Sequence, residues 1–181
     1  MDDRHGQAGL IGASGAPVAP GLGAELGLGD DVEVVAELGR GARTVVYHIR
    51  RGDVDYAVKM LNRSLLTDRR DGEAFCREAA LLARVNHPGV PAVFDVGTAR
   101  GRPYLVQEYV EGRLLARVIE AGPLDEPALN LLATNVAAAL DAAHRASVVH
   151  RDIKPANILI PADGRARLID FGLAAVGEES A

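Results

Sequence analysis

The sequence of 181 residues predicts an α+β fold, in which a small sheet with one helix comes first and a mostly helical part follows. Two observations predict this order. Between residues 32 and 108, short runs rich in Val, Ile and Tyr are separated by turn-forming residues, as in a sheet. Beyond residue 113, longer segments place their apolar residues at helical spacing. A run of strands followed by a run of helices is typical of the α+β class.

Individual elements follow from the periodicity. Val32 and Val34 alternate with charged residues, which predicts a strand with one buried face. Phe75 and Leu82 belong to an apolar stripe at helical spacing, which predicts a helix that packs on the sheet. We expect strands near 32–37, 44–49, 55–61, 92–96 and 104–108, and helices near 71–85, 113–120 and 126–146.

Composition excludes several classes of protein. A hydrophobic content of 48% and a charged content of 25% are those of a globular domain. The net charge of −5 argues against sequence-independent binding to nucleic acid. Cys76 is the single cysteine, so an intramolecular disulfide is excluded. The sequence shows neither an uncharged apolar run of 18 residues nor a signal-peptide pattern, and we therefore expect a cytoplasmic protein with no membrane segment.

Domain organisation is predicted from changes in composition. Residues 1–29 are rich in Gly, Ala and Pro and lack apolar periodicity, which predicts a flexible leader with order beginning near Asp31. Residues 30–110 hold the predicted strands and the first helix. Residues 111–181 hold the later helices and the polar motifs described next.

Three polar residues stand at a spacing that indicates phosphoryl transfer. Asp152 and Asn157 are five residues apart, and Asp170 follows Asp152 by 18 residues. This spacing is expected to place a carboxylate base, an amide and a second carboxylate around one point. Transfer of a phosphoryl group from a metal-bound nucleotide requires groups of these kinds.

The amino-acid sequence of these motifs is similar to that of the corresponding motifs in a known family. His-Arg-Asp-Ile-Lys-Pro-Ala-Asn at 150–157 and Ile-Asp-Phe-Gly at 169–172 resemble the eukaryotic-type (Hanks-type) protein kinases, in their bacterial form. Lys154 points to the serine/threonine branch. The resemblance covers residues 30–176 and implies a bilobal kinase fold. In that fold residues 30–110 are an N-lobe with a five-stranded sheet and the hinge, and residues 111–181 are part of the C-lobe with the catalytic loop.

The resemblance implies a role for each residue of the catalytic loop. Asp152 would orient the substrate hydroxyl and accept its proton, and Lys154 would offset the charge of the transferring phosphate. Asn157 and Asp170 would bind Mg²⁺ through hard oxygen ligands. The implied cofactors are therefore ATP and Mg²⁺.

A nucleotide loop is predicted between the first two strands. Gly39 and Gly41 let the backbone approach phosphate oxygens, and Gly41 lies 18 residues before Lys59. Thr44 stands where the family pattern has its third glycine, which puts loop flexibility and nucleotide affinity in question. The resemblance implies the residues that bind the nucleotide: Leu38, Gly39, Arg40, Gly41, Val46, Ala57, Lys59, Glu108, Val110 and Leu159.

Lys59 and Glu78 are predicted to form an ion pair. Lys59 lies in an apolar strand and needs an anion, while Glu78 borders the buried stripe of the first helix and needs a cation. The resemblance implies the same pair, with Lys59 also holding the α- and β-phosphates. It further implies a packing column that contains Leu82, His150 and Phe171.

The function expected from these residues is transfer of the γ-phosphate of Mg-ATP to Ser or Thr hydroxyls of protein substrates. Two alternatives remain open. The chain could be a nucleotide-binding scaffold of the pseudokinase type, or a small-molecule phosphotransferase of the aminoglycoside-kinase type. All catalytic side chains are present, which argues against the first, and the Arg-Asp-Ile-Lys-Pro wording argues against the second.

The end of the sequence bears on activity. Nine residues follow Gly172, and an Ala-Pro-Glu motif is not among them. We expect a fragment of a larger signalling kinase that binds nucleotide but phosphorylates protein poorly or not at all when isolated. We also expect Leu131, Leu132, Val136 and Leu140 to be partly exposed. Similar bacterial kinases often carry further modules, so additional C-terminal domains are among the expected partners.

Overall fold

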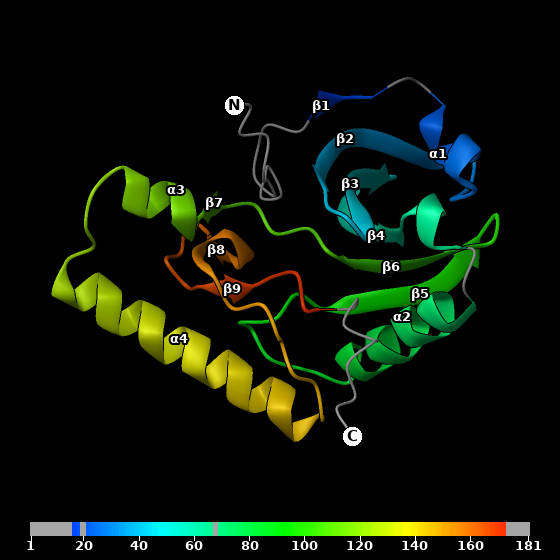
Figure 1. Cartoon of the computed structure of the whole chain (residues 1–181). Helices are drawn as coiled ribbons and strands as arrows, with labels where there is room; N and C mark the ends of the chain where they lie inside the picture. Colours follow the sequence, from blue (N-terminus) through cyan, green and yellow to red (C-terminus); the bar gives the residue numbers. More distant parts are fainter. Residues whose placement is uncertain (1–15, 19–20, 67–68, 173–181) are drawn as a thin grey trace, which may run out of the picture.

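The computed structural model describes residues 16–18, 21–66 and 69–172, and the structural statements below concern those residues. The N-terminal half forms an antiparallel six-stranded sheet in the order β1-β2-β3-β4-β6-β5 (Figure 1). The strands are β1 Ala16–Pro17, β2 Val32–Arg40, β3 Thr44–Arg51, β4 Val54–Leu61, β5 Val93–Ala99 and β6 Arg102–Glu108. Five of these are the predicted strands, and β1 is an additional short edge strand.

Helix α2 (Arg69–Leu82) packs against β5 and β6 and is the helix predicted for this half. Phe75 and Ala79 are fully buried between the helix and the sheet, and Leu82 continues the same apolar stripe. The stripe also reaches Val85, beyond the helical residues. The predicted packing face is therefore confirmed, although the helix ends three residues earlier than expected.

The second half is mostly helical, as predicted. Helix α3 spans Leu115–Glu120 and the long helix α4 spans Glu126–Arg145. The Asp125 carboxylate caps α4 by accepting a hydrogen bond from the backbone N–H of Ala128 at 2.8 Å. A second sheet joins β7 (Arg113–Leu114), β8 (Ile158–Ile160) and β9 (Arg167–Leu168), and a 3₁₀ turn covers Pro155–Asn157. In the described ranges, no helix has both the length and the apolar character that a membrane span requires.

Helix α4 leaves part of its apolar surface open. Leu131 is exposed, as is the neighbouring Leu129, while the other predicted positions Leu132, Val136 and Leu140 are half-buried against the main core. The expectation of partial exposure is therefore confirmed. Figure 1 shows α4 running along the outside of the second half, with one side facing away from the rest of the chain.

The prediction that order begins near Asp31 is wrong for the described part of the leader. Leu22–Leu26 form helix α1, and Ala16–Pro17 pair with β2 at Ala36 and Glu37. Leu26 is buried in the core beside β2 and β3, and a Cβ on Gly23 would meet the carbonyl oxygen of Val32. The leader has little apolar periodicity. The burial of Leu26 and the close approach of Gly23 to Val32 nevertheless pack one helical turn against the sheet. Residues 1–15 and 19–20 lie outside the described residues.

Replacement of Leu26 by alanine tests whether α1 is part of the fold. Loss of a buried leucine is expected to lower the free energy of unfolding by about 2–4 kcal/mol, because it removes apolar contact and leaves a cavity. The exposed Leu129→Ala serves as the matched control and should change stability by less than about 0.5 kcal/mol. Urea unfolding measures both variants, and equal effects would contradict a structural role for α1.

Candidate active site

The two predicted motifs lie side by side in the structure. The Gly172 N–H donates to the carbonyl of His150 at 3.1 Å, and the Ile169 N–H donates to that of Asn157 at 3.0 Å. The His150 Nε2–H donates to the Ile169 carbonyl at 3.0 Å, and its ring lies 4.5 Å from that of Phe171. Residues 150–157 and 169–172 therefore form one site. The packing of His150 and Phe171 expected from the packing column is confirmed.

Asp152 stands at the centre of a small polar cluster. The Asn157 amide nitrogen donates to the Asp152 backbone carbonyl at 2.8 Å and to its carboxylate at 2.9 Å. The Lys154 ammonium lies 2.7 Å from the same carboxylate. The hydrogen bond from Lys154, followed by that from Asn157, holds the pKa of Asp152 below its ordinary value despite partial burial. The Asp152 side chain is about half exposed, so an ionised carboxylate faces open space.

Two residues of the site have left-handed backbone conformations. The φ angles of Arg151 and Asp170 are 64° and 58°. A residue with a side chain in this region costs about 1 kcal/mol or more, so surrounding contacts must hold it there. The hydrogen bonds between the two motifs supply those contacts. Strain of this kind, beside a cluster of charged groups, is characteristic of functional sites.

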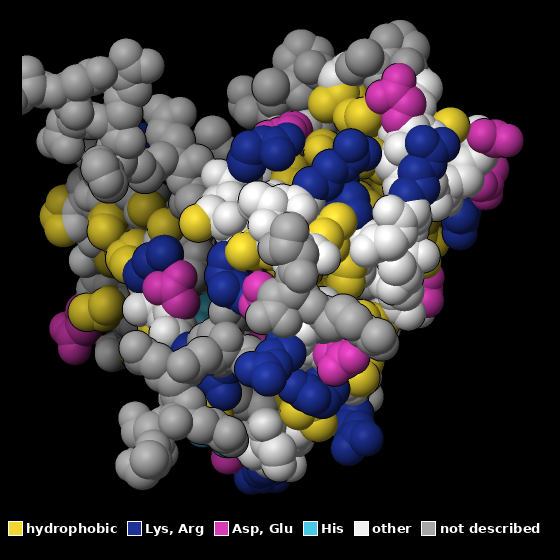
Figure 2. Space-filling model, turned by 45° about the vertical axis from the view of Figure 1, so that its right-hand side comes forward, with side chains coloured by type: hydrophobic (Ala, Val, Ile, Leu, Met, Phe, Trp, Pro, Cys, Tyr) yellow, Lys and Arg dark blue, Asp and Glu magenta, His cyan; other side chains and the backbone are white. Residues whose placement is uncertain are grey.

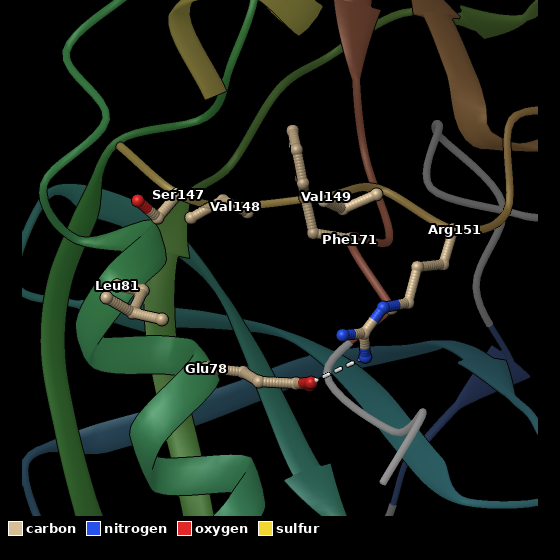
Figure 3. Close-up of a pocket in the computed structure, with 8 residues that line it drawn as sticks. Glu78, Leu81, Ser147, Val148, Val149, Arg151 and Phe171 are labelled. Carbon is tan, nitrogen blue, oxygen red and sulfur yellow. Dashed lines mark hydrogen bonds and ion pairs between the residues drawn. The ribbon is translucent and has the colours of Figure 1, made fainter. Parts of the chain in front are cut away.

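Lys59 does not pair with Glu78 in this structure, which corrects the prediction. Lys59 is 7% exposed, and its ammonium lies 3.0 Å from the Asp170 carboxylate. Glu78 instead forms an ion pair with Arg151 at 3.0 Å (Figure 3). The sequence spacing predicts Glu78 as the anion beside Lys59. The left-handed turns instead accompany an Asp170 carboxylate beside Lys59 and an Arg151 guanidinium beside Glu78, so the two pairs are exchanged.

Glu78 lies within the electrostatic influence of two cations, Arg151 and Lys59. Its Oε2 atom is buried and forms no hydrogen bond with the described residues. Burial raises the pKa of Glu78, an effect opposed first by Arg151 and less strongly by the charge of Lys59. Lys59 is thus close enough to act on Glu78 electrostatically without a hydrogen bond. A small cavity of about 70 Å³ separates α2 from the 147–151 segment here, with Glu78 and Phe171 in its walls (Figure 3).

The apolar residues predicted to line the nucleotide slot form one buried cluster. Leu159 and Ala57 lie at its centre, almost fully inaccessible to solvent. Leu114 and Ile169 also belong to the cluster and were missed, although Ile169 directly precedes Asp170 in the motif. The full buried cluster is Leu38, Val46, Ala57, Val110, Leu114, Leu159 and Ile169.

The two loop glycines are not required by the packing of the protein itself. Among the described residues, a Cβ on Gly39 would meet no atom within 4 Å, and one on Gly41 would meet only the Thr44 carbonyl at 3.7 Å. The Gly41 N–H donates to that carbonyl at 2.8 Å and closes the hairpin between β2 and β3. Open space above both glycines is what close approach of a ligand to the backbone requires.

The other two predicted binding residues make protein contacts. The Arg40 guanidinium bonds the Glu37 carboxylate, with Nε at 2.9 Å from Oε1. Glu108 binds Ala92 twice: its N–H donates to the Ala92 carbonyl at 2.8 Å, and its carboxylate accepts from the Ala92 N–H at 3.2 Å. These contacts fix the end of β6, from which the chain passes to Val110 in the slot.

Comparison with known proteins decides the family. Residues 32–181 match the family described as the protein kinase domain. This chain belongs to the protein kinase family. A probable serine/threonine-protein kinase of Streptomyces coelicolor is 39% identical over 154 residues, which are 81% of this chain and 23% of that protein. The serine/threonine-protein kinase PknK of Mycobacterium tuberculosis is 38% identical over 162 residues, 88% of this chain and 14% of PknK.

A solved structure shares the fold. The kinase domain of Mycobacterium tuberculosis PknI superposes with a TM-score of 0.65 and 31% identity, over 83% of this chain and 63% of that domain. The bilobal kinase fold expected from the sequence is confirmed. The chain spans less than a quarter of the length of the two curated relatives above, so their full activities do not transfer to it directly.

His150 gives this kinase fold a predicted pH dependence. Burial lowers the pKa of His150, which is 1% exposed, and the Ile169 carbonyl requires Nε2 to carry the proton of the neutral ring. The folded state therefore favours neutral histidine. Its stabilising contribution is complete above the ordinary pKa of 6.5 and is lost as pH falls below that value.

We expect the free energy of unfolding to fall between pH 7.5 and pH 5, by at most about 1.4 kcal/mol per pH unit from this group. The variant His150→Phe is expected to be less stable at every pH. The part of the pH dependence of its free energy of unfolding that comes from His150 should disappear. The exposed His144→Gln should retain the wild-type slope. Urea unfolding across the pH range measures the three slopes, and identical slopes in wild type and His150→Phe would contradict the account.

Proposed function

We propose that this chain carries the catalytic site of a kinase that transfers the γ-phosphate of Mg-ATP to Ser or Thr hydroxyls of protein substrates. The observation that supports this most strongly is the cluster of Asp152, Lys154 and Asn157 beside the Lys59–Asp170 ion pair. A base, two cations and two oxygen ligands in one place are the groups that phosphoryl transfer requires.

The nucleotide is proposed to enter between β2 and the small sheet. The buried apolar cluster around Ala57 and Leu159 would contact the base, with the backbone of residues 108–110 along its edge. Gly39 and Gly41 would lie against the phosphates, because the described residues leave the space above them open. Lys59 would neutralise the α- and β-phosphates from the floor of the slot.

Asn157 and Asp170 fit the requirements of a magnesium site. Both hydrogen bonds of the Asn157 side chain reach acceptor oxygens of Asp152, so its NH₂ faces Asp152 and its carbonyl oxygen faces away. Asp170 adds a partly exposed carboxylate, and the two oxygen donors suit a hard cation. When bound, Mg²⁺ would offset the negative charge of the phosphates.

Asp152 is proposed as the group that orients the substrate hydroxyl and accepts its proton. Its low pKa keeps it ionised at neutral pH, and its half-exposed position leaves it accessible to a substrate. Lys154, already beside it, would lie over the transferring phosphate and offset its charge.

Lys59 and Glu78 are proposed to exchange partners when Asp170 binds a cation. An Asp170 carboxylate that coordinates a metal holds Lys59 less strongly, which frees the ammonium for phosphate and for Glu78. The buried, unbonded Oε2 of Glu78 offers the acceptor for this second arrangement. The ion pair predicted from the sequence would thus belong to the nucleotide-bound state.

The wider context of the kinase is also a proposal. We propose that residues 30–110 and 111–181 are the N-lobe and part of the C-lobe, and that the active polypeptide contains further C-terminal residues, since the curated relatives are much longer. We also propose a cytoplasmic location and protein partners that carry Ser or Thr residues.

A direct transfer assay tests the proposed function. A natural polypeptide that contains this chain and a complete large lobe is incubated with Mg-ATP labelled at the γ-phosphate. We expect label on Ser and Thr of a basic protein substrate and none on an aminoglycoside. Nucleotide binding without transfer would instead indicate a binding module, and transfer only to the aminoglycoside would indicate a small-molecule phosphotransferase.

A further inference from the structure

A second pocket lies on the N-terminal sheet, next to the predicted nucleotide loop, with which it shares Arg40. It is open, has a volume of about 400 Å³, and is bounded by α1, the end of β2, β3, the turn after β4 and the start of β6. Three arginines line it: Arg40, Arg63 and Arg102. Figure 2 shows Lys and Arg side chains gathered over this half of the molecule. The catalytic groups described above are absent from its walls.

Arg102 is a buried cation without a carboxylate partner among the described residues. It is 6% exposed, and its Nε and Nη2 atoms both donate to one uncharged acceptor, the Leu61 carbonyl, at 3.1 and 3.0 Å. Burial lowers the pKa of Arg102, Tyr47 opposes this shift, and the charges of Arg63 and Arg40 add to it more weakly. A buried guanidinium with like charges nearby is costly unless an anion completes the site.

The other two arginines leave the pocket with excess positive charge. Arg40 is paired with Glu37, so its charge is balanced. Arg63 is exposed and forms no ion pair with the described residues. Three arginines and one glutamate therefore give a net charge of about +2 at the pocket. This charge matches a doubly charged oxyanion, and arginine forks are well suited to phosphate oxygens.

The remaining walls favour a peptide over a free ion. Asn62 also lines the pocket, and its amide nitrogen donates to the carbonyls of Gly41 and Ala42. Leu26 adds an apolar wall, and the Tyr47 side chain lies near Arg40. A single phosphate ion would leave the apolar wall without a contact.

We propose that this pocket binds a phosphoserine or phosphothreonine side chain of a peptide segment, with Arg63 and Arg102 holding the phosphate. The site is joined to the nucleotide loop, because the Asn62 amide nitrogen donates to the carbonyls of Gly41 and Ala42 at 2.9 and 3.0 Å. The proposal does not depend on the chain's own catalytic activity, since chemically phosphorylated peptides test it.

The test measures peptide binding to the full chain by fluorescence anisotropy. A labelled peptide with one phosphothreonine is expected to bind, and its unphosphorylated counterpart is expected to bind at least about tenfold more weakly. Arg63→Gln removes an exposed side chain with little risk to folding and should weaken the phosphopeptide by about tenfold. Arg165→Gln, an exposed arginine on the other half of the chain, is the matched control and should bind like wild type.

Two further binding measurements distinguish this pocket from other sites that could bind an anion. Lys59→Met should leave phosphopeptide affinity unchanged, whereas loss of binding in this variant would move the ligand to the nucleotide slot and overturn the proposal. Inorganic phosphate should compete only at much higher concentration than the phosphopeptide. Equal affinities would refute the peptide assignment, and an unchanged affinity in Arg63→Gln would refute the pocket itself.

Discussion

Asp152→Asn is expected to reduce phosphoryl transfer by about 10² to 10⁴-fold, the range that a positioned general base contributes. The asparagine retains the size of the side chain and its contact with the Asn157 amide nitrogen, but it cannot accept a proton from the substrate hydroxyl. Nucleotide affinity should stay within about threefold of wild type, because Asp152 lies outside the proposed base and phosphate contacts. Steady-state rates and binding titrations in the complete large-lobe polypeptide measure the two effects.

A matched carboxylate controls for the loss of charge. Asp163→Asn, in the exposed turn before β9, removes a carboxylate that among the described residues bonds only its own loop and Arg167, and it should leave transfer unchanged. Transfer in Asp152→Asn at more than a tenth of the wild-type rate would remove Asp152 from the role of proton acceptor.

Lys59→Met is expected to have the second large effect, on nucleotide binding. The variant loses a charge-assisted contact to the phosphates, which corresponds to an affinity decrease of about 10 to 100-fold. It also leaves Asp170 without the ion pair that holds it at 3.0 Å. Methionine keeps most of the volume of the buried side chain, so the core around β4 should remain intact. Calorimetric titration with Mg-ATP measures the change.

Lys154 provides the control, as the other lysine of the sequence. Its side chain is about half exposed and pairs with Asp152, so Lys154→Met should lower transfer but leave Mg-ATP affinity close to wild type. The two lysines are thus distinguished by which measurement changes. Equal losses of affinity in both variants would contradict the separate roles proposed for them.

The sequence predicted those parts of the site that depend on short-range spacing. Asp152, Lys154 and Asn157 lie within six residues, and one turn of backbone suffices to bring them together. The strands of the sheet were also predictable, because each has its own periodicity and turn signals. The adjacency of Asp170 to this loop came from the motif as a whole rather than from any single residue.

Choices between competing partners were not predictable. Lys59 and Arg151 both need an anion, and Glu78 and Asp170 both need a cation, so two pairings satisfy the same charges. In this structure the backbone turns at Arg151 and Asp170 accompany the pairs Lys59–Asp170 and Glu78–Arg151, and a left-handed conformation at a non-glycine residue leaves little trace in sequence. The order of α1 was missed for a related reason, since it rests on the burial of Leu26 by strands distant in sequence.

The pocket around Arg102 could not be found from sequence either. Its arginines come from three elements, and each one alone resembles an ordinary surface residue. Burial of Arg102 and the pairing of Arg40 with Glu37 become visible only in the fold.

Magnesium-dependent nucleotide binding tests the central claim most directly, because it requires only the chain described above. Calorimetric titration of a non-hydrolysable ATP analogue is performed with and without Mg²⁺ on wild type, Asp170→Asn and the control Asp163→Asn. The account predicts that Mg²⁺ strengthens binding in wild type and in the control by at least about tenfold, and that this gain disappears in Asp170→Asn. An affinity that is independent of Mg²⁺ in wild type, or a gain that survives in Asp170→Asn, would contradict the proposed site.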